Sequence, residues 1–144
     1  FFSICIFANA QTNSIKDGMT SEELSCAIKE FKSMIDTDTF IESEKKTKAF
    51  TEKIEDAIAL NNTPFDSIKN KEFALRFIKN NLNQTKFKSI EEAALCIDEM
   101  VSSGDKKMKE NKYLYELLSK ATPEQFIKIN EPYFERLKSA AYGH

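Results

Sequence analysis

The stretch TSEELSCAIKEFKSMI, residues 20–35, decides the fold class. It opens with Thr20 and carries Glu23 three residues later, which is the pattern of an N-terminal capping box. Apolar residues then recur every three or four positions, as they do along the buried face of an α-helix. These residues are Leu24, Ala27, Ile28, Phe31 and Ile35. The stretch therefore predicts an amphipathic helix with a marked start.

The same spacing recurs to the end of the chain, and no segment shows the period-two alternation of a strand. Further helices are expected from about Ser43 to Asn61, from Pro64 to Leu82, from Ser89 to Gly104, from Asp105 to Lys120, and from Pro123 onward. The predicted fold class is all-α: a single domain of five or six short amphipathic helices that pack irregularly.

Proline and glycine set several of these boundaries. Pro64 and Pro123 each follow a threonine, and proline suits the first position of a helix. Gly104 is expected to end its helix in a left-handed conformation. Pro132 lies inside the last helical pattern, so we expect a kink there or a split after Asn130.

The first ten residues, FFSICIFANA, are apolar and end in Ala-Asn-Ala. A short apolar run before small residues is typical of a secretory signal and its cleavage site, and the run is shorter than the roughly 20 residues of a membrane-spanning helix. We expect 1–10 to be the remnant of a signal peptide, cleaved before Gln11, and 11–144 to be a secreted, extracellular helical domain. The other interpretation is a buried first strand.

Secretion would affect the cysteines and two asparagines. Cys26 and Cys96 would remain after cleavage, and an even pair in a secreted domain is normally a disulfide. Two free buried cysteines are the alternative. Asn61 and Asn83 each begin an Asn-x-Thr sequon at a break in the helical pattern, so we expect a glycoprotein.

Composition favours binding over catalysis. Charged residues make up 31% of the chain with a net charge of −2, and the basic residues are interspersed with acids, so nucleic acid is not an expected partner. The single histidine is the last residue, His144, and no phosphate-binding, metal-binding or nucleophile motif is present. We expect no enzyme, no cofactor, no metal site and no integral membrane segment.

Phenylalanine and isoleucine are the most informative apolar residues. At helical spacing they ordinarily form a core. Irregularly packed short helices can also enclose an apolar cavity lined by the same side chains, with Arg76 or Lys79 at its mouth for a carboxylate head group. The candidate ligand-binding residues are Phe50, Ile54, Phe65, Ile68, Phe73, Phe77, Ile97 and Phe126.

Two segments carry a resemblance to a known family. YLYELLSKATPEQF, residues 113–126, resembles the junction of two helices in nematode fatty-acid- and retinol-binding proteins, and FKSIEEAAL, residues 87–95, is similar to the start of an earlier helix in that family. The resemblance implies a secreted, wholly helical carrier of fatty acids and retinol. Other secreted helical antigens of parasitic worms fit these features as well.

Two functions therefore follow from the sequence. The first is a secreted carrier that binds an apolar small molecule, such as a fatty acid or retinoid, in a cavity between helices. The second is a secreted interaction protein, an effector or host-directed antigen, that contacts a protein partner and has no small-molecule ligand.

Overall fold

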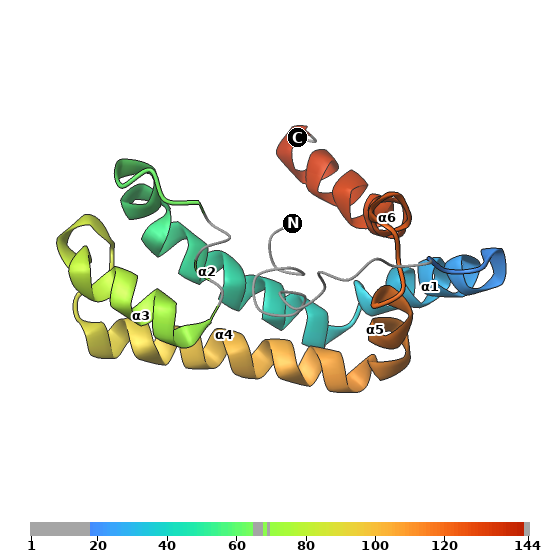
Figure 1. Ribbon diagram of the computed structural model, residues 1–144, viewed down its shortest axis with the longest axis horizontal. Coiled ribbons are helices and arrows are strands. Elements are labelled where there is room, and N and C mark those ends of the chain that lie inside the picture. Colours follow the sequence, from blue (N-terminus) through green and yellow to red (C-terminus); the bar gives the residue numbers. More distant parts are fainter. Residues whose placement is uncertain (1–17, 65–67, 69, 143–144) are drawn as a thin grey trace. The chain divides into compact units, whose positions relative to one another are not determined.

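The structure is a computed structural model that describes residues 18–64, 68 and 70–142, and its regular elements in this part of the chain are helices without strands (Figure 1). The predicted all-α class is confirmed. The elements are α1 (Ser21–Met34), α2 (Asp38–Leu60), α3 (Lys71–Asn80), the 3₁₀ helix η3 (Leu82–Gln84), α4 (Ile90–Glu110), α5 (Lys112–Leu118) and α6 (Pro123–Tyr142). The predicted signal remnant, 1–10, lies outside the described residues.

Several predicted helix starts are confirmed by their capping bonds. The Glu23 amide donates to Thr20 Oγ1 at 3.1 Å, and the Thr20 amide donates to the Glu23 carboxylate at 3.0 Å, which completes the capping box of α1. Ser89 Oγ accepts from the Glu92 amide at 3.1 Å at the start of α4. Each bond satisfies an amide that has no partner within its helix.

Two helices begin at other residues than predicted. The second helix starts at Asp38 rather than near Ser43, because Thr37 Oγ1 accepts from the Phe40 amide at 3.2 Å and supplies an earlier cap. The third helix starts at Lys71 rather than at Pro64. Asn70 caps it, because its Oδ1 accepts from the Phe73 amide at 3.0 Å. Ile68, which was expected on this helix, lies before it and outside helical structure.

The predicted helix end at Gly104 is wrong. Helix α4 continues through Gly104 to Glu110. Asn111 then interrupts the helical structure, and α5 begins at Lys112. A glycine inside a helix costs only about 1 kcal/mol relative to alanine, which the packing of a long helix can offset. Helix α6 likewise continues through Pro132 without a split, and its axis bends along its length (Figure 1).

Residue contacts divide the helices into two compact units, and the boundaries fall inside α2, after Ile41, and inside α4, after Lys106. Among the described residues, unit 1 comprises 42–106, and unit 2 comprises 18–41 and 107–142. Each unit has its own buried apolar side chains.

In unit 1, two ion pairs show the register of α2 against α4. Lys46 Nζ lies 3.3 Å from the Glu99 carboxylate, and Lys53 Nζ lies 3.0 Å from that of Glu92. The lysines and the glutamates are each seven residues apart, about two helical turns, so each pair of like residues shares one face. The higher number pairs with the lower, so the two helices run antiparallel.

In unit 2, α1 packs against α5 and α6. Its buried side chains include Phe31, Phe40 and Ile129, and the Phe40 ring meets Tyr133 edge to face at 5.4 Å between centroids. Gln125 at the start of α6 holds the chain before α1: its Oε1 accepts from the Met19 amide and its Nε2 donates to the Met19 carbonyl, both at 2.9 Å.

Candidate functional site: the apolar cluster of unit 1

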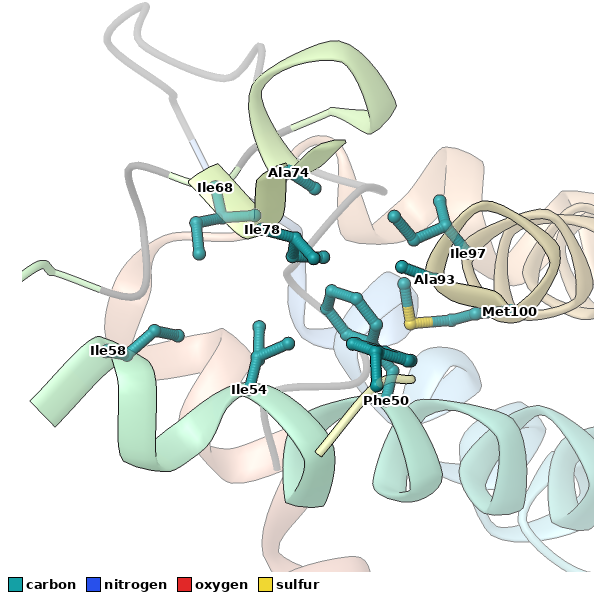
Figure 2. Packing of buried hydrophobic residues seen from close by; sticks show 10 residues of the cluster. Phe50, Ile54, Ile58, Ile68, Ala74, Ile78, Ala93, Ile97 and Met100 are labelled. Carbon is teal, nitrogen blue, oxygen red and sulfur yellow. The ribbon is translucent and has the colours of Figure 1, made fainter. Parts of the chain in front are cut away.

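Helices α2, α3 and α4 place their apolar faces around one cluster in unit 1, and Figure 2 shows these side chains pointing toward one another. Phe50 and Ile54 come from α2 and Ile97 from α4, and all three are fully buried. The fully or largely buried members are Phe50, Ile54, Ile58, Ile68, Ala74, Ile78, Phe87, Ala93, Ile97 and Met100. The side chains fill the space between the helices by contact with one another.

The structure brings together most of the predicted ligand-binding residues. Phe50, Ile54, Ile68 and Ile97 belong to the cluster, and Phe77 is partly buried against it. Helical periodicity was sufficient to identify Phe50, Ile54 and Ile97, because the residues on the buried faces of α2 and α4 meet in the cluster. Ile68 is buried in the cluster although it lies outside helical structure.

Two predicted residues lie elsewhere: Phe73 is 49% exposed on α3, and Phe126 lies on α6 in unit 2. A third, Phe65, lies outside the described residues. Phe73 was misplaced because α3 begins at Lys71, with Ala74 and Ile78 rather than Phe73 on its buried face.

The edge of the cluster carries a cation that sequence reasoning did not single out. Lys53 Nζ, which pairs with Glu92, also lies 5.5 Å from the ring centroid of Phe87. Phe87 is 5% exposed, and its ring is tilted against that of Phe50, with 6.3 Å between the two centroids. Hydrogen bonds from Lys53 and from the Lys88 amide lower the pKa of Glu92. Phe87 lies in the connection between η3 and α4, so helical periodicity could not predict its burial.

The cations expected at the mouth of a cavity lie on the surface. Arg76 is held over the exposed Phe73 ring, at 5.3 Å from its centroid, and pairs with Glu72 at 3.3 Å within α3. Lys79 is exposed. Lys53 is thus the lysine that the structure places beside a ring of the cluster.

The predicted disulfide is not formed, and Cys26 and Cys96 are both free. Each cysteine side chain contacts residues of its own unit. Cys26, on α1, donates to Tyr113 Oη at 3.8 Å, while Cys96, on α4, is partly buried against the apolar cluster. Burial raises the pKa of the Cys96 thiol. Both cysteines are free, as in the alternative interpretation, but each is partly exposed rather than buried.

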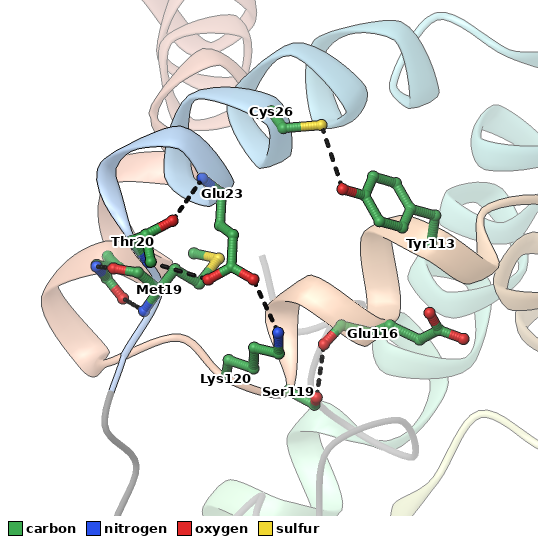
Figure 3. Close-up of polar contacts among 9 residues, drawn as sticks. Met19, Thr20, Glu23, Cys26, Tyr113, Glu116, Ser119 and Lys120 are labelled. Atoms are coloured by element: carbon green, nitrogen blue, oxygen red, sulfur yellow. Dashed lines mark hydrogen bonds and ion pairs between the residues drawn. The ribbon is translucent and has the colours of Figure 1, made fainter.

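The contact of Cys26 belongs to a polar group between α1 and α5 (Figure 3). Its main ion pair joins Lys120 Nζ to the Glu23 carboxylate at 2.8 Å. Hydrogen bonds from Lys120 and from the Thr20 amide lower the pKa of Glu23, and the same pair raises the pKa of Lys120. The hydrogen bond with Cys26 raises the pKa of Tyr113. Each of these groups is explained by its role in joining α1 to the rest of unit 2.

The two sequon asparagines differ in their surroundings. Asn61, at the end of α2, donates from Nδ2 to the Ala57 carbonyl at 2.7 Å and to Gln84 Oε1 at 2.6 Å. Asn83 lies exposed in η3. Glycosylation stays a prediction at both residues.

Among the described residues, no three histidine, cysteine, aspartate or glutamate side chains lie close enough together to hold a metal ion. None of the described helices combines the length and the apolarity needed to cross a bilayer. The chain matches no protein-family model, no curated protein and no solved structure.

Proposed function

We propose that this protein is a secreted carrier that binds an apolar small molecule, of the fatty-acid or retinoid type, between α2, α3 and α4 of unit 1. The observation that supports the proposal is the convergence of Phe50, Ile54, Ile68 and Ile97 in one apolar cluster. Such side chains are those that line most ligand sites. The proposed role is binding and transport rather than catalysis.

The geometry sets a condition on this function. The cluster side chains are in mutual contact, and Phe50, Ile54 and Ile97 are 0% exposed. An acyl chain can therefore bind in the cluster only if one of the helices moves away from the other two. The ligand then replaces the apolar contacts that this helix made.

Binding is tested by titrating delipidated protein with a fluorescent fatty acid, displacing it with unlabelled oleate, and analysing the purified protein for lipid by mass spectrometry. We expect saturable, displaceable binding. A photoreactive fatty acid should then label peptides from 42–106. Absence of saturable binding and of copurifying lipid, or labelling confined to 107–142, would refute the proposal.

Secretion is part of the same proposal and has its own test. Protein isolated from its natural source is expected to begin at Gln11, which N-terminal sequencing or intact-mass analysis would detect. A mature protein that retains FFSICIFANA would contradict cleavage at that site.

A second candidate function is that of a secreted interaction protein. The observation that favours it is the exposure of large apolar side chains, with Leu60 at 70% and Leu95 at 61%. Interaction surfaces need such residues to be accessible. A protein that retains its fold, binds no fatty acid and loses a defined protein partner on Leu95→Glu substitution would favour this function over the carrier.

A further inference from the structure

Helix α3 contributes the fewest buried side chains among the three helices that surround the cluster of unit 1. Of its ten residues, Ala74 and Ile78 are buried. Leu75 and Phe77 are partly buried against the cluster, whereas Phe73 is 49% exposed. Figure 2 shows Ala74 and Ile78 reaching from α3 toward side chains of α2 and α4.

Helices α2 and α4 are joined to each other independently of α3. Phe50 and Ile54 meet Ile97 and Met100 in the cluster. The Lys46–Glu99 and Lys53–Glu92 ion pairs lie along the same two helices. These α2–α4 contacts include no residue of α3, and the apolar ones are fully or largely buried.

The polar contacts of α3 are weak or local. Asn70 caps its own helix, and Glu72 pairs with Arg76 one turn away. The Lys71–Asp98 ion pair, at 2.6 Å, joins α3 to α4, but its side chains are 48% and 55% exposed. An ion pair this exposed contributes little to stability. A helix of ten residues is also marginal without packing.

From these contacts we propose that α3 is a displaceable cover of the apolar cluster. Local opening moves α3 away from the α2–α4 pair and uncovers Phe50, Ile54 and Ile97, on which an alkyl chain then packs. Openings of this kind occur at lower free energy than global unfolding where few apolar contacts hold a segment. The part played by the ligand rests on the proposed function, whereas the opening of α3 does not.

Hydrogen exchange of the full chain without ligand, followed by mass spectrometry, tests the opening. We expect residues 71–80 to show protection at least about tenfold lower than the most protected amides of α4. Asp98→Asn should lower the protection of α3 a further twofold to fivefold, roughly the effect of one exposed ion pair. Glu99→Gln, on the adjacent residue, removes the pairing with Lys46 and is the matched control, expected to have no selective effect on α3.

Equal protection of α3 and α4, or equal effects of both substitutions on α3, would overturn the proposal. Repeating the measurement with saturating sodium oleate tests access of the ligand, which should change the protection of α3 more than that of α6. Saturable oleate binding with unchanged α3 protection would refute access by this route. Absence of binding would refute the proposed function and the ligand's part in the opening, while the ligand-free comparison alone decides whether α3 opens.

Discussion

At the scale of the residue, two glycines have opposite requirements. Gly104 lies inside α4, where an added Cβ would meet no neighbouring heavy atom within 4 Å outside the adjacent helical backbone. Gly104→Ala should raise the free energy of unfolding by about 1 kcal/mol, because alanine loses less backbone entropy in a helix. Urea denaturation followed by circular dichroism at 222 nm measures this change.

Gly18 is the contrasting position. Its φ of +87° favours glycine, and an added Cβ would lie 2.9 Å from Thr122 Cγ2. Gly18→Ala should therefore lower the free energy of unfolding by about 1 kcal/mol or more in the same titration. A neutral result would show that the chain before α1 relaxes away from Thr122 without cost.

Ile97 and Leu95 are close in sequence but differ in burial. Ile97 is 0% exposed in the cluster, and Leu95 is 61% exposed. Ile97→Ala should cost about 2–5 kcal/mol of unfolding free energy because it leaves a cavity, whereas Leu95→Ala should change it by less than about 0.5 kcal/mol. A small effect of Ile97→Ala in the denaturant titration would contradict close packing at the centre of unit 1.

At the scale of the element, the first turn of α1 links folding to pH. The pKa of Glu23 is lowered in the folded protein, so the folded state binds this proton less readily than the unfolded state does. The stabilisation is present above the ordinary carboxyl pKa and is lost as the pH falls through the lowered value. Glu23→Gln should therefore reduce the loss of stability between pH 7 and pH 3, measured by urea midpoints.

Glu22, exposed in the same turn, provides the control. Glu22→Gln removes the same charge without the bonds to Thr20 and Lys120. Equal pH dependence in both variants would show that the Glu23 contacts do not stabilise α1.

The helical class and many element positions could be predicted from local pattern, but some boundaries could not. The caps at Thr20, Ser89 and Thr122 are short-range signals and predicted their helices correctly. Gly104 is locally a good helix end, and only the continued packing of α4 explains why the helix passes it. Thr37 is also a short-range cap, but the apolar pattern that predicts α2 begins several residues after it.

The candidate site was predictable to the same degree. Phe50, Ile54 and Ile97 follow the helical period, so the sequence identifies them as buried. It does not identify Phe87, which lies in a connection, or the pairing of Lys53 with Glu92, which requires the register of two helices distant in sequence.

At the scale of the whole molecule, the division into units has no sequence signal, because both of its boundaries within the described residues fall inside helices rather than in linkers. Unit 1 is continuous over 42–106 and contains its own apolar cluster and its own interhelical ion pairs. A fragment of these residues should be helical and unfold cooperatively, with a stability of only a few kcal/mol because small domains bury little surface.

Thermal denaturation of the fragment by circular dichroism, with the fragment carrying Ile97→Ala as a control, measures this behaviour. The control should lose its cooperative transition, since the expected cost of the substitution matches the whole stability of the fragment. A fragment that melts without a transition would show that unit 1 depends on the remainder of the chain.

The two hydrogen bonds between the Gln125 side chain and the Met19 backbone also affect how the protein responds to force. The Gln125 side-chain amide both donates to and accepts from the backbone of Met19, so two hydrogen bonds, each 2.9 Å long, join residues 106 positions apart in the sequence. Tension applied at Gly18 reaches these bonds before it reaches the first turn of α1. Gln125 therefore anchors the chain immediately before α1. A force applied ahead of Met19 would have to break these two hydrogen bonds before it could unwind the helix.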